Sequence, residues 1–340
     1  MKAFVVSYGD LAKLIDEAKK SYTIYGPVRK GGSYVFSRVD GLGDMELNYN
    51  RTILPPKKFF HLPYEVLMKF KLRDGFEIEA EAKAEPIMVF GVHPCDLNAI
   101  LRLDEFFSRK FEDPYYLSRR EKSLIVVLNC RGAKDEYCFC ASLNTGPIAE
   151  GGYDLALTEL EAGLFLLEVG SPKGDELVEK LNFPKAEVEH LEAKERIKAY
   201  AKNTFHRRAD FEGLVPAPLD HPVWEEEAKK CFSCGTCSLV CPTCYCYDIY
   251  DEVGLSLKEG IRVRRLDSCQ LYEYSEVALG GNFRRERKAR LRHWMTCKFG
   301  GAGGGRYSSC VGCGRCISLC PAGIDITEVA SKLKEVVKYA

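Results

Sequence analysis

The residues with the clearest chemical meaning are cysteines that repeat one spacing twice near the C-terminus. Both copies read Cys-x2-Cys-x2-Cys-x3-Cys-Pro, and they run from Cys231 to Pro242 and from Cys310 to Pro321. In bacterial proteins that carry this run, the thiolates hold two [4Fe–4S] clusters. Two complete copies are very hard to obtain by chance, so the sequence predicts iron–sulfur clusters and one-electron chemistry.

The spacing within each copy predicts which cysteines share a cluster. Two intervening residues let a tight loop bring three thiolates to one cube, whereas the fourth cysteine starts a new segment and reaches the neighbouring cube. The proline after each fourth cysteine fixes φ and suits the first turn of a helix. The expected ligands are therefore crossed: Cys231, Cys234, Cys237 and Cys320 for cluster 1, and Cys310, Cys313, Cys316 and Cys241 for cluster 2.

Composition argues against other uses of these thiols and against several kinds of partner. The chain has 340 residues and 16 cysteines, and without an export signal we expect a cytoplasmic protein whose cysteines bind metal rather than form disulfides. Zinc normally takes four ligands as two pairs instead of two runs of four. Lys+Arg and Asp+Glu number 49 each, which favours neither nucleic acid nor a polybasic membrane anchor. No apolar run has the length of a membrane span.

The first 222 residues predict an α/β domain. Apolar runs at 86–92 and 123–128 are continuous, as expected of strands that are buried on both faces of a sheet. A strand at 2–7 leads into an amphipathic helix, and a helix at 96–107 follows the strand at 86–92. Further expected elements are short strands at 34–38 and 46–48, a hairpin at 155–160 and 164–169, and helices at 174–181 and 186–206.

Prolines at 216, 218 and 222 place the expected domain boundary at residue 222. The second domain, 223–340, carries both cysteine motifs and ends in an amphipathic helix that begins after Asp325. The insert at 242–309 separates the motifs and is expected to be mostly helical, with a flexible glycine loop at 300–305. The prediction is an α+β multidomain chain, in which the α/β domain is followed by a dicluster domain of the α-helical ferredoxin type.

A third set of cysteines lies in loops that follow the predicted strands of the first domain and consists of Cys95, Cys130, Cys138 and Cys140. Loops at the carboxyl ends of neighbouring strands meet at one edge of an α/β sheet, and we therefore expect this set to hold a third cluster. The alternatives are small buried hydrophobic residues or a zinc site. His93 could replace or hydrogen-bond a ligand, although a single histidine is more often structural.

A fourth set lies in the second domain and consists of Cys244, Cys246, Cys269 and Cys297. We expect the first two on a helix opened by Pro242. The four thiols either converge on a further metal site or pack around the two clusters and tune their surroundings, and spacing does not decide between these interpretations. The basic run at 284–292 is a solvated helix face or a docking surface for an acidic partner, and its field would raise the potential of a nearby cluster.

The chain contains no recognisable catalytic motif. It has no Walker loop, no dinucleotide-binding glycine pattern, no hydrolase elbow and no zinc-protease motif, and neither remaining cysteine set has the paired spacing of a nickel site. Clusters without a catalytic centre are typical of an electron-transfer subunit whose donor and acceptor sites lie on other polypeptides. The competing interpretations are a self-contained flavin- or substrate-binding enzyme and an iron–sulfur protein that acts on nucleic acid.

Several motifs besides the paired runs make the chain resemble a known family. They are Asn-Arg-Thr-Ile-Leu-Pro-Pro-Lys-Lys-Phe-Phe at 50–60, Phe-Gly-Val-His-Pro-Cys-Asp at 90–96, Asp-Glu-Tyr-Cys-Phe-Cys at 135–140, Cys-Pro-Thr-Cys-x-Cys-Tyr at 241–247 and Asp-Ser-Cys-Gln at 267–270. Together with both cysteine runs, they are similar to the beta subunit of archaeal cytosolic sulfhydrogenases, the NAD(P)-linked nickel–iron hydrogenases. The same family includes the corresponding electron-relay subunit of anaerobic sulfite reductase.

The resemblance implies a role and a set of partners. It implies a heterotetramer in which a gamma subunit binds flavin and NAD(P), and the delta and alpha subunits are the hydrogenase small and large subunits. This chain would relay electrons between these modules during H2 oxidation or evolution and sulfur reduction. In the sulfite reductase, it would feed a sirohaem subunit instead. The motif agreement and the single glutamine, Gln270, in a charge-rich chain favour a hyperthermophile sulfhydrogenase.

Overall fold

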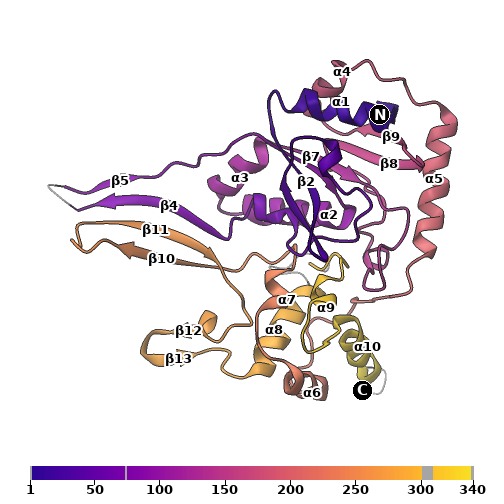
Figure 1. The fold of residues 1–340 in the computed structure, drawn as a ribbon. Helices are drawn as coiled ribbons and strands as arrows, with labels where there is room; N and C mark the ends of the chain where they lie inside the picture. Colours follow the sequence, from indigo (N-terminus) through magenta and orange to yellow (C-terminus); the bar gives the residue numbers. More distant parts are fainter. Residues whose placement is uncertain (1, 73–74, 301–308, 338–340) are drawn as a thin grey trace.

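The structure, a computed structural model, describes residues 2–72, 75–300 and 309–337 (Figure 1). Its N-terminal part is built on a seven-stranded sheet in the order β1-β9-β8-β7-β6-β2-β3. The neighbouring strands β2, β6, β7 and β8 are parallel, and β1, β9 and β3 add antiparallel pairs at the edges. The strands are β1 (Ala3–Ser7), β2 (Thr23–Lys30), β3 (Ser33–Arg38), β6 (Ile87–Val92), β7 (Ser123–Leu128), β8 (Leu155–Glu161) and β9 (Leu164–Val169).

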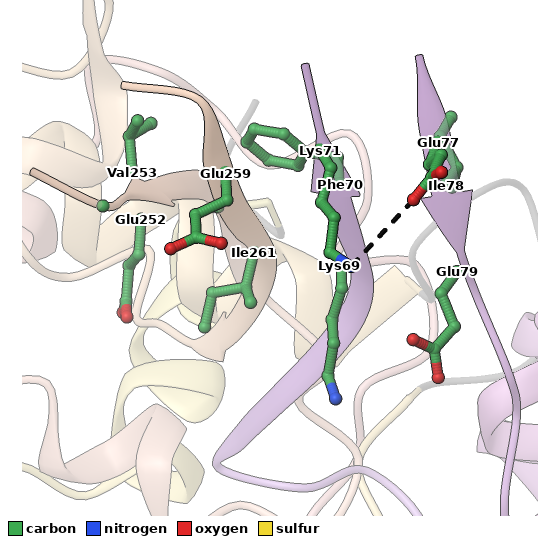
Figure 2. A pocket seen from close by; sticks show the side chains of 12 residues that line it. Lys69, Phe70, Lys71, Glu77, Ile78, Glu79, Glu252, Val253, Glu259 and Ile261 are labelled. Atoms are coloured by element: carbon green, nitrogen blue, oxygen red, sulfur yellow. Dashed lines mark ion pairs between the residues drawn. The ribbon is translucent and has the colours of Figure 1, made fainter. Parts of the chain in front are cut away.

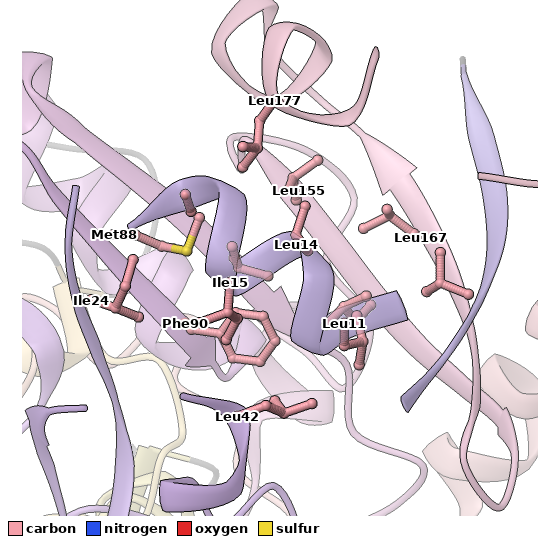
Figure 3. Packing of buried hydrophobic residues seen from close by; sticks show 14 of the residues in the cluster. Leu11, Leu14, Ile15, Ile24, Leu42, Met88, Phe90, Leu155, Leu167 and Leu177 are labelled. Carbon is pink, nitrogen blue, oxygen red and sulfur yellow. The ribbon is translucent and has the colours of Figure 1, made fainter. Parts of the chain in front are cut away.

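Helices cover both faces of this sheet because its central strands are apolar on both sides. Every residue of β7 is buried, with Leu124 and Val126 in one core and Ile125 and Val127 in the other. The first core packs against α1 (Tyr8–Ala18) and α4 (Pro172–Glu179), and Figure 3 shows its side chains meeting between α1 and the strands. The second core lies under α2 (Pro94–Ser108) and α3 (Pro114–Glu121).

A second sheet extends from the molecule as an arm (Figure 1). Its order is β10-β11-β4-β5, with β4 (Tyr64–Lys71) and β5 (Glu77–Glu79) from the first half of the chain and β10 (Tyr247–Val253) and β11 (Glu259–Leu266) from the second. A cavity of about 580 Å³ in the arm is lined by acidic and basic side chains, among them Lys69, Glu79 and Glu259 (Figure 2). None of its described lining residues is a cysteine, so the candidate chemistry lies elsewhere.

The second half of the chain holds the paired cysteine motifs between helices. A third core forms there around Trp224, Trp294 and Leu333, and it also takes in Phe211 and Leu214 from before the expected domain boundary, which remains a prediction. The helices after the main sheet are α5 (Val188–Asn203), α6 (Pro222–Lys230), α7 (Thr236–Leu239), α8 (Arg287–Gly300), α9 (Arg315–Ser318) and α10 (Ile326–Val337). The small strands β12 (Glu276–Val277) and β13 (Gly281–Asn282) pair with each other. Short 3-10 helices are η1 (Leu42–Asp44), η2 (Pro56–Phe59), η3 (Cys140–Leu143), η4 (Glu273–Ser275) and η5 (Ala278–Gly280).

The predicted combination of an N-terminal α/β sheet domain and a C-terminal dicluster domain is confirmed, but the insert between the motifs is not mostly helical. Residues 242–309 contain β10, β11, β12 and β13, and α8 is the longest helix described there. The helical expectation was wrong because β10 pairs with β11, and β11 pairs in turn with the distant β4, a partner that local sequence does not reveal. The short strand expected at 46–48 is also wrong, since these residues form no strand.

Most of the other expected elements are confirmed. The predicted strands correspond to β1, β3, β6 and β7, and the predicted hairpin corresponds to β8 and β9. The expected glycine loop lies outside the described residues except for Gly300. Within the ranges that the structure describes, no helix combines the length and the apolar character needed to cross a bilayer.

Candidate iron–sulfur sites

The two cysteine motifs fold in the same way. In each motif, the glycine after the second cysteine is left-handed, with φ 77° at Gly235 and 75° at Gly314. A four-residue helix follows, α7 or α9, and it carries the third cysteine of the motif. Glycine suits this turn because other residues are strained at positive φ. The turn lets each motif curl back on itself, as the ligands of one cluster must.

Backbone N–H groups donate to sulfur in both motifs. The N–H of Ser233 lies 3.3 Å from Cys231 Sγ, and the N–H of Gly312 lies 3.4 Å from Cys310 Sγ. Hydrogen bonds to cluster sulfurs are among the interactions that set reduction potential, because they stabilise negative charge on the sulfur. The folded motifs therefore supply polar groups that suit an anionic cluster.

The first expected ligand set is brought together around Cys237. Burial raises the pKa of the Cys237 thiol, and the neighbouring thiolates of Cys231, Cys320 and Cys234 raise it further. The thiol of Cys320, from the second motif, therefore lies beside those of the first motif. A small cavity of about 30 Å³ is lined by these same four cysteines and by Cys316.

The second expected ligand set is brought together around Cys316. Burial raises the pKa of its thiol, and the thiolates of Cys310, Cys313 and Cys241 act in the same direction. Cys241, from the first motif, therefore lies within reach of the second. Both neighbourhoods agree with the crossed arrangement expected from the spacing, and the ligand assignment itself remains a prediction.

The third cysteine set also converges, and it lies against the second motif. Burial raises the pKa of Cys140, with further contributions from Cys130, Cys138 and Cys313. Burial likewise raises the pKa of Cys95, which interacts with Asp96, Cys140 and Cys313. The start of α2 after β6 and the segment after β7 thus bring this set together beyond the carboxyl ends of these parallel strands. That it holds a cluster remains a prediction.

His93 occupies a structural position next to this set. Its side chain is buried, and its ring stacks on Tyr49 with ring centroids 4.1 Å apart and planes 8° apart. Burial lowers the pKa of His93 well below its usual value, and the positive charges of Lys134, Arg315 and Arg51 lower it further. Two of these cations are paired with carboxylates that also lie beside the third set, Arg51 with Asp135 and Arg315 with Asp96.

The second motif packs directly on the loop that carries the third set. The Phe139 N–H donates to the Gly312 carbonyl at 2.9 Å, and the Thr145 hydroxyl donates to the Val311 carbonyl at 2.8 Å. Gly312 has φ +63°, and a Cβ placed on it would lie 2.5 Å from the backbone nitrogen of Cys140. Only glycine permits this approach of the two segments.

We expect Gly312→Ala to push the second motif away from the third set. The strain of alanine at positive φ costs about 1–2 kcal/mol, and the steric clash adds about 1–3 kcal/mol. The matched control is Gly323→Ala, because Gly323 has φ +64° but a Cβ there meets no atom within 4 Å. Thermal midpoints and iron content of the two variants measure the difference. Equal losses of thermal stability and iron in the two variants would show that the close approach of Gly312 to Cys140 does not matter for the fold.

The fourth cysteine set lines one cavity of about 750 Å³. Its first two members do not lie on a helix as expected, since residues 242–246 are irregular and Tyr247 begins β10. The Cys246 and Cys269 thiols are joined by a hydrogen bond, which lowers the pKa of Cys246 to about 6. The structure therefore brings the four thiols to one cavity by strand pairing and by α8, without the predicted helix.

The segment from Arg51 to Lys57 contacts three of the four cysteine groups. Arg51 Nη2 lies 4.0 Å from Cys138 Sγ in the third set. The carbonyl of Thr52 accepts a hydrogen bond from Arg315 of the second motif, at 2.8 Å. Lys57 Nζ donates to a backbone carbonyl of the fourth set, at 2.7 Å. We predicted no role for these residues from the sequence. The sequence feature that could have pointed to them is the motif at 50–60, and the structure shows that its Arg and Lys side chains are largely buried.

Thiolates in complete runs of four at this spacing are the donor set of iron–sulfur clusters. Among the residues that the structure describes, no three Cys, His, Asp or Glu side chains lie close enough together to hold one metal ion. This also applies to the two sets from the paired motifs, whose spacing is that of cubane ligands.

Comparison with known proteins agrees with this chemistry. Residues 230–324 match the family described as a 4Fe-4S dicluster domain. Over 330 residues, the chain is 38% identical to sulfhydrogenase 2 subunit beta of Pyrococcus furiosus, an alignment that covers 95% of this chain and 96% of that protein. No solved structure matches the chain. The resemblance expected from the motifs is confirmed, and the chain belongs to the sulfhydrogenase beta-subunit family.

Proposed function

We propose that this chain is the electron-relay subunit of a sulfhydrogenase. It would carry electrons between a gamma subunit that binds flavin and NAD(P)H and the delta and alpha subunits of a nickel–iron hydrogenase. The observation that carries the proposal is the continuous series of thiol sets, each lying against the next. The relative is itself named as a subunit, which supports assembly with partner chains.

The series can be followed from the third set to the first motif. Cys95 and Cys140 of the third set both interact with Cys313 of the second motif. Cys316 of the second motif interacts with Cys237 of the first. Clusters held by these thiols would follow one another, cluster 3 beside cluster 2 and cluster 2 beside cluster 1. Such an order is what a one-electron relay through a single chain requires.

The protein's own contribution is to position these thiols and to set their electrostatic environment. When bound, [4Fe–4S] clusters would supply the one-electron chemistry. Arg102 donates to the Cys310 carbonyl at 2.6 Å, and Arg315 lies buried within the second motif. Positive charge near a cluster stabilises its reduced, more negative form. Arg102 would therefore favour electron residence at cluster 2, in the middle of the series, whereas the charge of Arg315 is balanced by its ion pair with Asp96.

A cluster-removing variant in the assembled complex tests the relay. We expect Cys313→Ala to abolish NAD(P)H-dependent H2 evolution, because electrons from the flavin could no longer pass cluster 2. Viologen-dependent H2 evolution should persist, since a viologen delivers electrons directly to the hydrogenase subunits. The control is Ser331→Ala on α10, where the hydroxyl donates to the Thr327 carbonyl of its own helix and both activities should stay at the wild-type level.

The identity of the co-purifying subunits completes this experiment. NAD(P)H-linked turnover that survives in Cys313→Ala would contradict the relay. Turnover or a flavin spectrum in the isolated chain would instead assign a self-contained enzyme. A sirohaem partner in place of the hydrogenase subunits would assign the chain to an anaerobic sulfite reductase.

A further inference from the structure

We propose that the cavity lined by the fourth cysteine set binds an additional [4Fe–4S] cluster and that Lys57 and Lys298 compensate its negative charge. The inference rests on the proposed function, because this cluster would be a further station of the same relay. Its four ligands would be Cys244, Cys246, Cys269 and Cys297.

The four thiols reach the cavity from three separate parts of the fold. Cys244 and Cys246 lie between the first motif and β10, Cys269 follows β11, and Cys297 lies on α8. Cys246 and Cys269 are in hydrogen-bond contact, and the thiolates of both Cys244 and Cys297 act on Lys298. Cys244, Cys246 and Cys269 pack against the third core, and all four cysteines also border the cavity of about 750 Å³.

Two lysines are buried next to these thiols. Lys57 is 3% exposed and Lys298 is 2% exposed. Lys57 Nζ donates to the Cys244 carbonyl at 2.7 Å, and Lys298 Nζ lies 3.1 Å from Thr243 Oγ1. They come from opposite ends of the chain, Lys57 from η2 and Lys298 from α8. Both ammonium groups thus converge on the one short segment that carries the first ligands.

Buried ammonium groups require a compensating negative charge. Taking a charge out of water is costly unless an opposite charge lies nearby. Burial lowers the pKa of Lys57, and within the described residues the thiolates of Cys244 and Cys241 oppose that shift most strongly, ahead of any carboxylate. Neutral thiols cannot balance two positive charges, whereas a cluster with four thiolate ligands is an anion. The lysines therefore indicate a charged centre at the thiols and argue against a purely apolar packing role.

The same cavity lies between both predicted clusters and the protein surface. The Cys244 thiol is hydrogen-bonded to that of Cys241, a predicted ligand of cluster 2. The thiolate of Cys237, a predicted ligand of cluster 1, acts on Cys269. The cavity is also lined by Phe283, whose side chain is 79% exposed. A cluster here would adjoin the internal series on one side and the exterior on the other, where electrons can pass to a partner subunit.

Metal analysis of the anaerobically purified complex tests this site. Replacing either Cys269 or Cys297 by alanine is expected to remove about four iron atoms per chain, together with the matching sulfide. The low-temperature EPR signals of the paired-motif clusters should remain. Thr296→Ala is the matched control, because Thr296 lines the same cavity without a thiol and its replacement should keep all the iron. Unchanged iron in both cysteine variants, or zinc in place of the lost iron, would overturn the proposal.

A redox titration tests the role of the lysines without removing a ligand. Lys57→Met should lower the midpoint potential of the one signal that Cys269→Ala abolishes, because a positive charge beside the reduced cluster is lost. Its neighbour provides the control: Lys58 donates to the Phe36 carbonyl, and Lys58→Met should leave that potential unchanged. An equal potential in Lys57→Met and the wild type would overturn the charge-compensation role.

The wild-type complex separates the failure of this inference from failure of the relay. If the wild-type complex contains the same amount of iron per chain as the cysteine variants, and relay activity is intact, only the additional cluster is overturned. Iron–sulfur signals absent from the whole chain would overturn the proposed function as well. Should the cysteine variants at this site fail to fold, Lys57→Met is compared with the wild type in the signals that Cys313→Ala retains. A midpoint potential that is lowered there, and not in Lys58→Met, still requires a cluster beside Lys57, and unchanged potentials would overturn the proposal.

Discussion

Replacing Arg315 with methionine is expected to lower the free energy of unfolding by about 3–5 kcal/mol. The side chains of Arg315 and Asp96 are each 1% exposed. Nη1 and Nη2 of Arg315 donate to the two carboxylate oxygens of Asp96, at 2.6 and 2.8 Å. Without the guanidinium, Asp96 would be left as a buried charge with no counter-ion, and the Thr52 carbonyl would lose its Nε donor. Removing one partner of a buried pair therefore costs far more than the pair itself contributes.

A double-mutant cycle with an exposed control tests this explanation. Asp96→Leu alone should cost a similar amount, whereas the double variant Arg315→Met/Asp96→Leu should recover much of the loss because no buried charge remains. Arg262 makes the same two-point contact with Asp251, at 2.7 and 2.8 Å, but these side chains are 45% and 35% exposed. Arg262→Met should therefore cost much less than Arg315→Met, because solvent screens an exposed pair. Guanidinium midpoints of the anaerobic protein measure all four variants, and equal losses in Arg262→Met and Arg315→Met would contradict the prediction.

The position of this ion pair gives it a functional consequence. Arg315 lies between Cys313 and Cys316 of the second motif, and Asp96 directly follows Cys95 of the third set. The pair therefore fixes two predicted cluster sites relative to each other. Breaking it should disturb the step between clusters 3 and 2 as well as stability.

The N-terminal sheet could be predicted because its strands carry their own signal. β7 is apolar along its whole length, and α1 repeats buried residues on one face after a capping box of Ser7 and Asp10. β2 carries no such signal because it contains Gly26 and Pro27. The structure explains this glycine, since a Cβ on Gly26 would lie 2.6 Å from the sulfur of Met45. The arm was missed for a different reason: its strands are half exposed, and they pair across most of the chain.

The candidate sites also contain some features that local sequence predicts and others that depend on residues far apart in the chain. The paired motifs are recognisable because their spacing is a local property of the chain. The cations around them are not, since Lys57 lies 187 residues from Cys244 and Arg315 lies 219 residues from Asp96. No periodicity or spacing connects residues so far apart, and only the packing of the two halves brings them together. The convergence of the fourth set depended on the same packing, which is why its spacing left two interpretations open.

Cys320→Ala is expected to remove the cluster of the first motif and to spare that of the second. Cys320 belongs to the second motif in sequence, but its thiolate acts on Cys237 of the first motif. If each motif instead bound its own cluster with all four of its cysteines, the same variant would lose the second cluster. In either case about four iron atoms are lost, so iron content alone cannot distinguish the two arrangements.

The EPR spectrum of the reduced protein makes this distinction, because the two clusters have different surroundings and should give different signals. The signal lost in Cys320→Ala should be the one lost in Cys234→Ala, where the ligand belongs to the first motif in both arrangements. Cys241→Ala should likewise match Cys313→Ala. Alanine is the appropriate replacement because a serine oxygen can still bind iron. If Cys320→Ala matched Cys313→Ala instead, each motif would hold its own fourth ligand, and the direct link that crossed ligands provide between clusters 1 and 2 would be lost from the relay.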